Sequence, residues 1–191
     1  MSDDLWVIGT SLKGRLLVAT PALGEGIFDR SVVLVIEHDD VEGAFGVVLN
    51  RPSETDVAGA LPEWARLAAS PPVVFVGGPV NPEAAICLAR VVGGEADGWL
   101  RLVGTVGALD LSRDPELLVP AVDELRLFAG YAGWSQGQLE DEIEAGAWFV
   151  VDAEEGDALN DEPDSLWQRV LRRQRGRLAM FAAFPADPST N

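Results

Sequence analysis

Histidine and cysteine are nearly absent from this sequence. The chain of 191 residues contains one of each, His38 and Cys87. A single cysteine excludes an internal disulfide, and the apolar run AAICLARVV around Cys87 favours a small, buried core residue. A catalytic thiol would need a histidine partner, and nothing in the sequence pairs Cys87 with His38.

Several signatures of common enzyme classes are also missing. The chain has no Cys-x-x-Cys and no His-Glu-x-x-His, and VGGP at 76–79 lacks the lysine and the hydroxyl of a phosphate-binding loop. We therefore expect no cofactor.

Long hydrophobic runs and basic residues are scarce as well. No apolar run approaches the roughly 18 residues that a membrane span needs, and the first ten residues, MSDDLWVIGT, lack the basic and apolar regions of a signal peptide. Fourteen bases stand against 31 acids, a net charge of −17 that repels phosphate backbones. We expect a cytoplasmic protein that has no membrane association and does not bind DNA directly.

The one concentration of basic residues is QRVLRRQRGRL, near the C-terminus. Two interpretations stay open: a helix C-terminus with favourable charges and counterions for the acidic remainder, or a docking patch for an acidic partner or nucleic acid. The residues of this basic patch are Arg169, Arg172, Arg173, Arg175 and Arg177.

Hydrophobic residues make up 48% of the chain, enough for a sizeable core. Apolar, often β-branched runs predict strands, and two of them form a hairpin around the turn DDVEG. The predicted strands are 15–20, 31–38, 44–50, 71–76, 84–92, 98–106, 126–134 and 147–153. The predicted helices are 57–70, which Pro62 interrupts or restarts, 112–119 and 162–174. The 84–92 run also fits a helix. Without a regular alternation of strands and helices, this pattern predicts a single α+β domain with a mostly antiparallel or mixed sheet.

The stretch GYAGWSQGQLEDEIEAGAW at 130–148 predicts a strand, a turn, a capped helix and a second strand. Ser135 and Gln138 have the spacing of a capping box, in which each side chain bonds the other residue's backbone N–H. Gly137 would then lie in the first helical turn, where glycine costs about 1 kcal/mol relative to alanine. Close packing or a ligand at the helix start would explain that cost, and Gly133, Trp134, Gly137, Gln138 and Glu140 are the ligand-binding candidates there.

Two further places hold candidate site residues. His38 lies among acids in EHDD and is a weak metal candidate, because strand neighbours point to opposite faces. Asn50 and Arg51 end a predicted strand, and Arg51 either clamps a carboxylate or phosphate ligand or forms a structural ion pair.

Four motifs in order resemble the AlgH/YqgE family of bacterial putative transcriptional regulators: GRLLVATPALGEGIFDRSVVLVIEHDDVEGAFGVVLNRP, VFVGGPV, GYAGWSQGQLEDEIEAGAWFV and LW in the last helix. The resemblance covers residues 12–175 of a predicted single domain at 1–191, with a flexible tail at 185–191. It implies a compact domain whose strands curl towards a barrel, flanked by short helices, and it implies no reaction. The matching positions are His38, Asn50, Arg51, Gly77, Gly78, Pro79, Gly130, Gly133, Trp134, Gly137, Gln138, Leu139 and Glu140.

Two main functional hypotheses follow. The first is a non-enzymatic regulatory or adaptor protein that acts through a protein partner or a small ligand. The alternative is an enzyme or metal-dependent protein that uses His38, Arg51 and the turn from Trp134 to Glu140, which requires these residues to meet in one cleft. A homo-oligomer with an exposed apolar edge is a third possibility.

Overall fold

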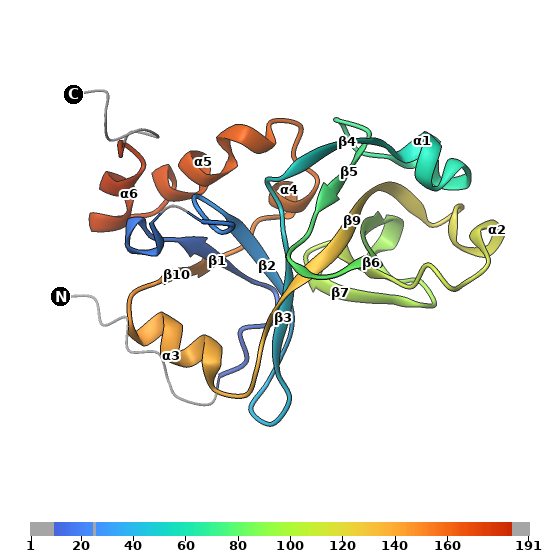
Figure 1. Cartoon of the computed structure of the whole chain (residues 1–191). Coiled ribbons are helices and arrows are strands. Elements are labelled where there is room, and N and C mark those ends of the chain that lie inside the picture. Colours follow the sequence, from blue (N-terminus) through green and yellow to red (C-terminus); the bar gives the residue numbers. More distant parts are fainter. Residues whose placement is uncertain (1–9, 25, 185–191) are drawn as a thin grey trace.

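Ten strands form one curled sheet in the computed structural model, which describes residues 10–24 and 26–184 (Figure 1). The strands are β1 (Arg15–Ala19), β2 (Val32–Asp39), β3 (Gly43–Val48), β4 (Pro52–Asp56), β5 (Val73–Val76), β6 (Val80–Val91), β7 (Trp99–Val103), β8 (Val106–Leu109), β9 (Val122–Trp134) and β10 (Trp148–Asp152). The main path through the sheet is β10-β1-β2-β3-β9-β6-β8-β7. β5 pairs with β9 in parallel, and the other ladders among the described residues are antiparallel.

Short helices cover this sheet. The α-helices are α1 (Val57–Ala60), α2 (Pro115–Leu118), α3 (Gln138–Glu144), α4 (Glu155–Ala158), α5 (Leu166–Arg172) and α6 (Arg177–Phe181). Short 3-10 helices lie at η1 (Pro21–Leu23), η2 (Pro62–Leu67), η3 (Val92–Gly94) and η4 (Pro163–Ser165). Among the described residues, none of these helices combines the length and the apolar character needed to cross a membrane.

The strands β1 and β2 are buried on both faces, which explains their unbroken apolar sequences. Leu16 and Val18 of β1 pack in one cluster with the inward side of α5, whereas Leu17 and Ala19 pack in another with Leu139 of α3. In Figure 1, α5 and α6 accordingly lie on one side of these strands and α3 lies on the other. The inward residues of α5 are Leu166, Trp167, Val170 and Leu171, as its helical spacing predicts.

The curl of the sheet brings its β7 edge back towards the start of β1. The Gly14 N–H donates to the Val35 carbonyl at 2.9 Å. A β-carbon on Gly14 would lie only 2.6 Å from the Leu102 carbonyl oxygen of β7. This approach confirms the predicted curl towards a barrel. The strand pairing and the short helices described above confirm the α+β class and the mixed sheet.

The element predictions agree with the structure in type more than in length. The hairpin is β2–β3, and the ambiguous run at 84–92 is a strand, since all of it except Val92 lies in β6. The helix predicted over 57–70 divides at Leu61 into α1 and η2, because Pro62 cannot continue the hydrogen bonds of α1. The predicted tail at 185–191 lies outside the described residues.

Candidate functional site

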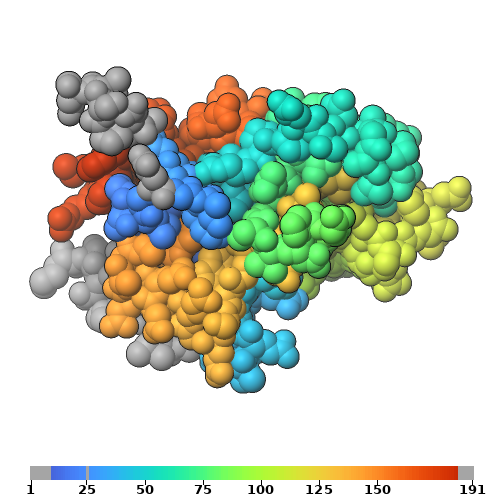
Figure 2. Space-filling model, in the orientation of Figure 1, coloured from blue at the N-terminus to red at the C-terminus, as the bar shows by residue number. Residues whose placement is uncertain are grey.

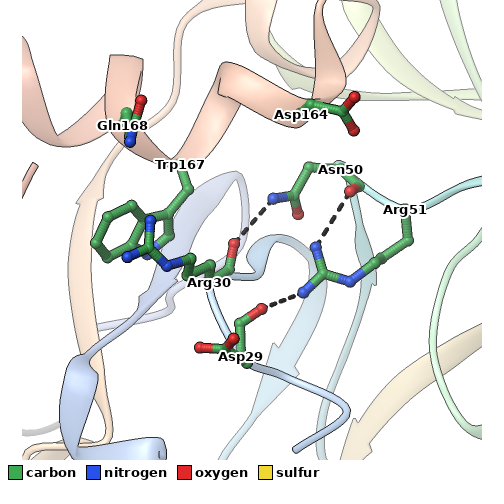
Figure 3. Close-up of a pocket in the computed structure, with 7 residues that line it drawn as sticks. All are labelled: Asp29, Arg30, Asn50, Arg51, Asp164, Trp167 and Gln168. Carbon is green, nitrogen blue, oxygen red and sulfur yellow. Dashed lines mark hydrogen bonds between the residues drawn. The ribbon is translucent and has the colours of Figure 1, made fainter. Parts of the chain in front are cut away.

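A polar cavity of 360 Å³ lies where the β3–β4 connection meets the start of α5 (Figure 3). Three segments far apart in the sequence build it: the turn before β2, the residues after β3, and η4 with α5. We call it the Arg30–Arg51 pocket, and its lining residues are Asp29, Arg30, Asn50, Arg51, Asp164, Trp167 and Gln168.

Asn50 holds the wall of this pocket together. Its side chain is 5% exposed, its Oδ1 accepts from the Val32 N–H at 3.0 Å, and its Nδ2 donates to the Arg30 carbonyl at 2.9 Å. Because the amide is satisfied by backbone groups on both sides, Asn50 positions the pocket rather than offering donors to a ligand.

Arg51 reaches into the pocket without a carboxylate partner. Its guanidinium donates to the carbonyl of Asn50 at 3.2 Å and to the carbonyl of Asp29. None of the ion pairs among the described residues includes Arg51. Burial lowers the pKa of Arg51 from its ordinary value, and the charges of Asp29 and Asp164 offset only part of that effect. The predicted structural ion pair of Arg51 is therefore not formed with any described carboxylate.

Arg30 supplies a second guanidinium that the sequence analysis missed. Its φ of 51° is in the left-handed region, which is uncommon for a residue other than glycine. The guanidinium lies over the ring of Trp167 at 4.7 Å and donates to the Phe184 carbonyl at 2.7 Å. Like Arg51, it forms no ion pair with a described carboxylate. A strained turn therefore holds a second half-buried cation at the same pocket.

The second group of candidates lies at the hairpin end of β2, around His38. The His38 Nδ1 accepts from the Leu12 N–H at 3.0 Å, so Nε2 carries the proton and donates to Glu140 Oε1 at 2.6 Å. With both ring nitrogens engaged, His38 has no lone pair left for a metal. Among the described residues, no group of three or more His, Cys, Asp or Glu side chains could hold a metal ion.

The predicted capping box at the start of α3 is half right. Gln138 Oε1 accepts from the Ser135 N–H at 3.0 Å as predicted, but the Gln138 N–H donates to the Ser135 backbone carbonyl and not to its hydroxyl. The helix begins two residues later than predicted, with Gly137 in place of Ser135 as its N-cap, at a φ of 75°. A β-carbon on Gly137 would have no described heavy atom within 4 Å, so the predicted close packing at this glycine is not found, and the ligand interpretation stays a prediction. The left-handed turn from β9 into α3 is what favours glycine there.

The segment GWSQG at 133–137 also matches the Gly-x-Ser-x-Gly spacing of hydrolase nucleophiles, at a strand-to-helix turn where such a serine belongs. The geometry around Ser135 differs from that of such a nucleophile. Ser135 has no positive φ, its hydroxyl donates to Gln138 Oε1 at 3.2 Å, and His38 is engaged elsewhere. In the described part of the chain, the Ser135 hydroxyl therefore has no hydrogen-bonded base that could activate it.

Trp134 is fixed by a carboxylate that the sequence analysis missed. Glu142 Oε2 accepts from the indole N–H groups of Trp134 and Trp148, each at 2.9 Å. The two rings meet edge to face with centroids 5.9 Å apart, and both side chains are buried. Trp134 therefore has a structural partner, and Gly133 beside it makes only ordinary contacts.

Replacing Glu142 with leucine should lower the free energy of unfolding by about 2 kcal/mol, because two buried indole N–H groups lose their acceptor. Urea unfolding, followed by tryptophan fluorescence, measures the change. Glu144→Leu on the same helix is the matched control, since Glu144 is exposed and should change stability by less than about 0.5 kcal/mol. Equal effects of the two variants would contradict this role for Glu142.

The two groups of candidates do not meet. His38 pairs with Ala44 and Val33 pairs with Val48, so Asn50 and Arg51 lie at the opposite end of the β2–β3 hairpin. Five residues of extended strand separate the two ends by about 17 Å. Figure 2 shows the turn of this hairpin projecting from the surface. Of the residues in the enzyme hypothesis, His38 and the turn from Trp134 to Glu140 therefore meet through the His38–Glu140 contact, whereas Arg51 lies apart from both.

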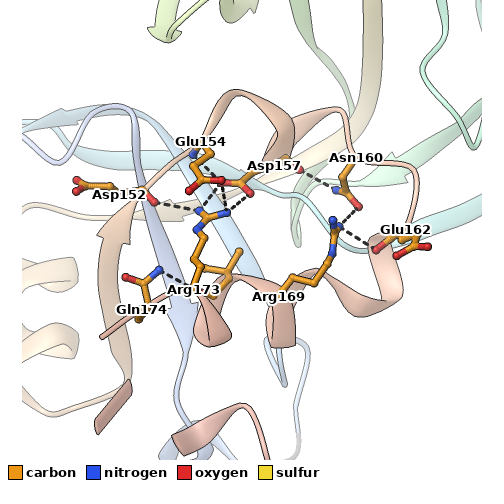
Figure 4. Close-up of polar contacts among 9 residues, drawn as sticks. Asp152, Glu154, Asp157, Asn160, Glu162, Arg169, Arg173 and Gln174 are labelled. Atoms are coloured by element: carbon orange, nitrogen blue, oxygen red, sulfur yellow. Dashed lines mark hydrogen bonds and ion pairs between the residues drawn. The ribbon is translucent and has the colours of Figure 1, made fainter. Parts of the chain in front are cut away.

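Two arginines of the basic patch have structural partners (Figure 4). Arg173 donates to both carboxylate oxygens of Asp157 at 2.6 Å, and Arg169 donates to Asn160 Oδ1 at 2.9 Å. These two arginines fasten α5 to the α4 segment. Arg169 is nevertheless exposed, as are Arg172, Arg175 and Arg177. The last three form no side-chain hydrogen bond or ion pair with the described residues, and they stay candidates for a docking patch.

Comparison with known proteins returns one consistent family. A family model described as AlgH-like matches residues 16–179. A UPF0301 protein of Streptomyces coelicolor is 56% identical over 187 residues, covering 95% of this chain and 96% of its own length. The crystal structure of protein DIP2367 from Corynebacterium diphtheriae superimposes with a TM-score of 0.83 at 36% identity, covering 90% of this chain and 92% of that one. The solution structure of the AlgH protein from Pseudomonas aeruginosa superimposes with a TM-score of 0.67 at 26% identity, covering 98% of this chain and 100% of that one.

Proposed function

This chain belongs to the AlgH-like family, and we propose that it is a non-enzymatic regulatory or adaptor protein that binds a small ligand in the Arg30–Arg51 pocket. The main support for this proposal is electrostatic. In a chain of net charge −17, two half-buried guanidiniums that line one cavity are without an ion-pair partner among the described residues. Such cations gain most from a ligand with a negative group, because burial has already removed part of their hydration.

Ligand binding in this pocket would act on a protein partner through α5. Gln168 lines the pocket, and Arg172 follows four residues later, on the same face of the helix and exposed to solvent. Arg30 also contacts the Phe184 carbonyl, just beyond α6. A ligand that moves Arg30 or Gln168 would therefore change the presentation of the exposed arginines to an acidic partner. The acidic chain as a whole would act in the cytoplasm without contacting DNA directly.

The test is to identify small molecules that co-purify with the full chain from its native cells. Mass spectrometry of the denatured extract should recover a metabolite from the wild type and from Arg66→Met, an exposed arginine outside the pocket. Arg51→Met should lose it. The purified complex is then incubated for a day, and the metabolite should be recovered unchanged.

Conversion of the metabolite during incubation would replace the regulatory proposal with an enzymatic one. Equal recovery from Arg51→Met and the wild type would remove the pocket as the site. Cross-linking the acidic partner equally well with and without the metabolite would contradict the regulatory output.

A further inference from the structure

The charged groups that line the Arg30–Arg51 pocket balance each other without pairing. Arg30 and Arg51 contribute two positive charges, and Asp29 and Asp164 contribute two negative ones. Neither carboxylate forms a hydrogen bond or an ion pair with the described residues, although both lie near enough to influence Arg51. The pocket therefore keeps opposite charges apart at its wall, where each can meet a separate group of a ligand.

The arginines retain donors for such a ligand. A guanidinium has five N–H donors, and the protein uses two bonds from Arg51 and one from Arg30. Figure 3 shows the two guanidiniums on either side of the Asn50 amide, with the Asp164 carboxylate on the helical side of the pocket. The Gln168 side chain adds an amide that both donates and accepts.

Net charge distinguishes between ligand classes. A phosphate ester would bring about two negative charges into a lining of net charge zero, on a chain of net charge −17. A simple carboxylate would meet the arginines but repel Asp29 and Asp164. A ligand with one carboxylate and one ammonium adds no net charge, and each of its groups has an opposite partner.

We propose that this pocket binds a zwitterionic small molecule of the amino-acid class, with its carboxylate on Arg51 and Arg30 and its ammonium towards Asp164 and Asp29. This assignment rests on the function proposed above and specifies the ligand of that site. The cavity of 360 Å³ is at the lower end of the range for small-molecule sites, which suits a ligand of this size.

The experiment titrates the full chain calorimetrically with the common L-amino acids, followed by their N-acetyl and methyl ester derivatives and inorganic phosphate. At least one amino acid should bind with a Kd below about 1 mM. Its N-acetyl form, which lacks the ammonium, and its methyl ester, which lacks the carboxylate, should each bind at least about tenfold more weakly. Phosphate should not bind.

Variants of the pocket make the assignment sharper. Arg51→Met and, as a milder change, Gln168→Leu should weaken the binding of the amino acid, whereas the exposed control Arg66→Met should leave its affinity unchanged. The double variant Asp29→Asn/Asp164→Asn leaves a lining of net charge +2, so it should prefer the N-acetyl form to the free amino acid. Circular dichroism melts show whether each variant is folded. If Arg51→Met does not fold, Gln168→Leu still tests the pocket.

Two results would overturn the zwitterion assignment: phosphate or the N-acetyl form binding the wild type as tightly as the free amino acid, or no amino acid binding at all. If a metabolite still co-purifies in an Arg51-dependent way, only the ligand class is wrong. If no metabolite co-purifies and no tested compound binds, the proposed ligand-binding function is contradicted as well.

Discussion

Replacing Arg126 with alanine should lower the free energy of unfolding by about 3–5 kcal/mol, one of the two largest effects that the structure predicts for a single substitution. Arg126 lies on β9 and is 1% exposed. Its guanidinium donates to the carbonyls of Ser70 at 2.6 Å, Ala158 at 3.2 Å and Asn160 at 2.8 Å. It therefore ties together two loops that are far apart in the sequence.

The size of this effect follows from what the alanine variant leaves behind. Three carbonyls would lose their donor inside the protein, and the ring of Phe75, which lies 4.2 Å from the guanidinium carbon, would lose its cover. Holding the charge there is itself costly, because burial lowers the pKa of Arg126 to about 10. The Nε atom has no hydrogen-bond partner within residues 10–24 and 26–184. The arginine is thus stabilising through the loops it joins and the ring it covers.

Chemical unfolding of the full chain measures the difference, with Arg90→Ala as the matched control. Arg90 lies on the neighbouring strand β6, pairs with Glu124 and Asp123, and is more exposed, so its loss should cost about 1 kcal/mol or less. Arg126→Met keeps the packing on Phe75 but removes the hydrogen bonds, and it should fall between the two. If Arg126→Ala costs no more than Arg90→Ala, the loops are held by other contacts.

The fold was predictable wherever local pattern and burial agree. The inward stripe of α5 and the apolar runs of β1 and β2 have periodicities that match their packing. The role of Arg126 had no such signal, since it stands at the start of the run RLFAGYAGW and its acceptors lie 56, 32 and 34 residues away. Contacts of this range depend on how the sheet curls, which no short stretch of sequence specifies.

The candidate site was predictable only in part for the same reason. Asn50 and Arg51 were identified because a polar pair ends a strand. Arg30 and Trp167 were missed, although they complete the pocket, because a cation–ring contact across 137 residues leaves no local pattern. The left-handed turn at Arg30 was also hidden, since it carries neither the glycine nor the asparagine that usually marks such a turn.

Gly43→Ala should destabilise the protein by about 3 kcal/mol or more, because it combines backbone strain with a collision. Gly43 has a φ of 96°, in a region that side chains disfavour. A β-carbon there would overlap the Trp134 carbonyl oxygen and approach the Ser135 carbonyl carbon, at 2.8 Å. These are backbone atoms, so neither can rotate out of the way as the end of a side chain could.

Gly137→Ala provides the matched control for strain without collision. Its φ of 75° is also positive, but no heavy atom lies within 4 Å of the missing β-carbon, so alanine should cost only about 1 kcal/mol. Urea unfolding of both variants separates the two contributions, and equal losses would mean that β9 shifts freely away from the hairpin. The close approach that the sequence suggested for Gly137 is thus found instead across the β3–β9 ladder at Gly43. There it holds the hairpin end of β2–β3, with His38, against the turn that leads into α3.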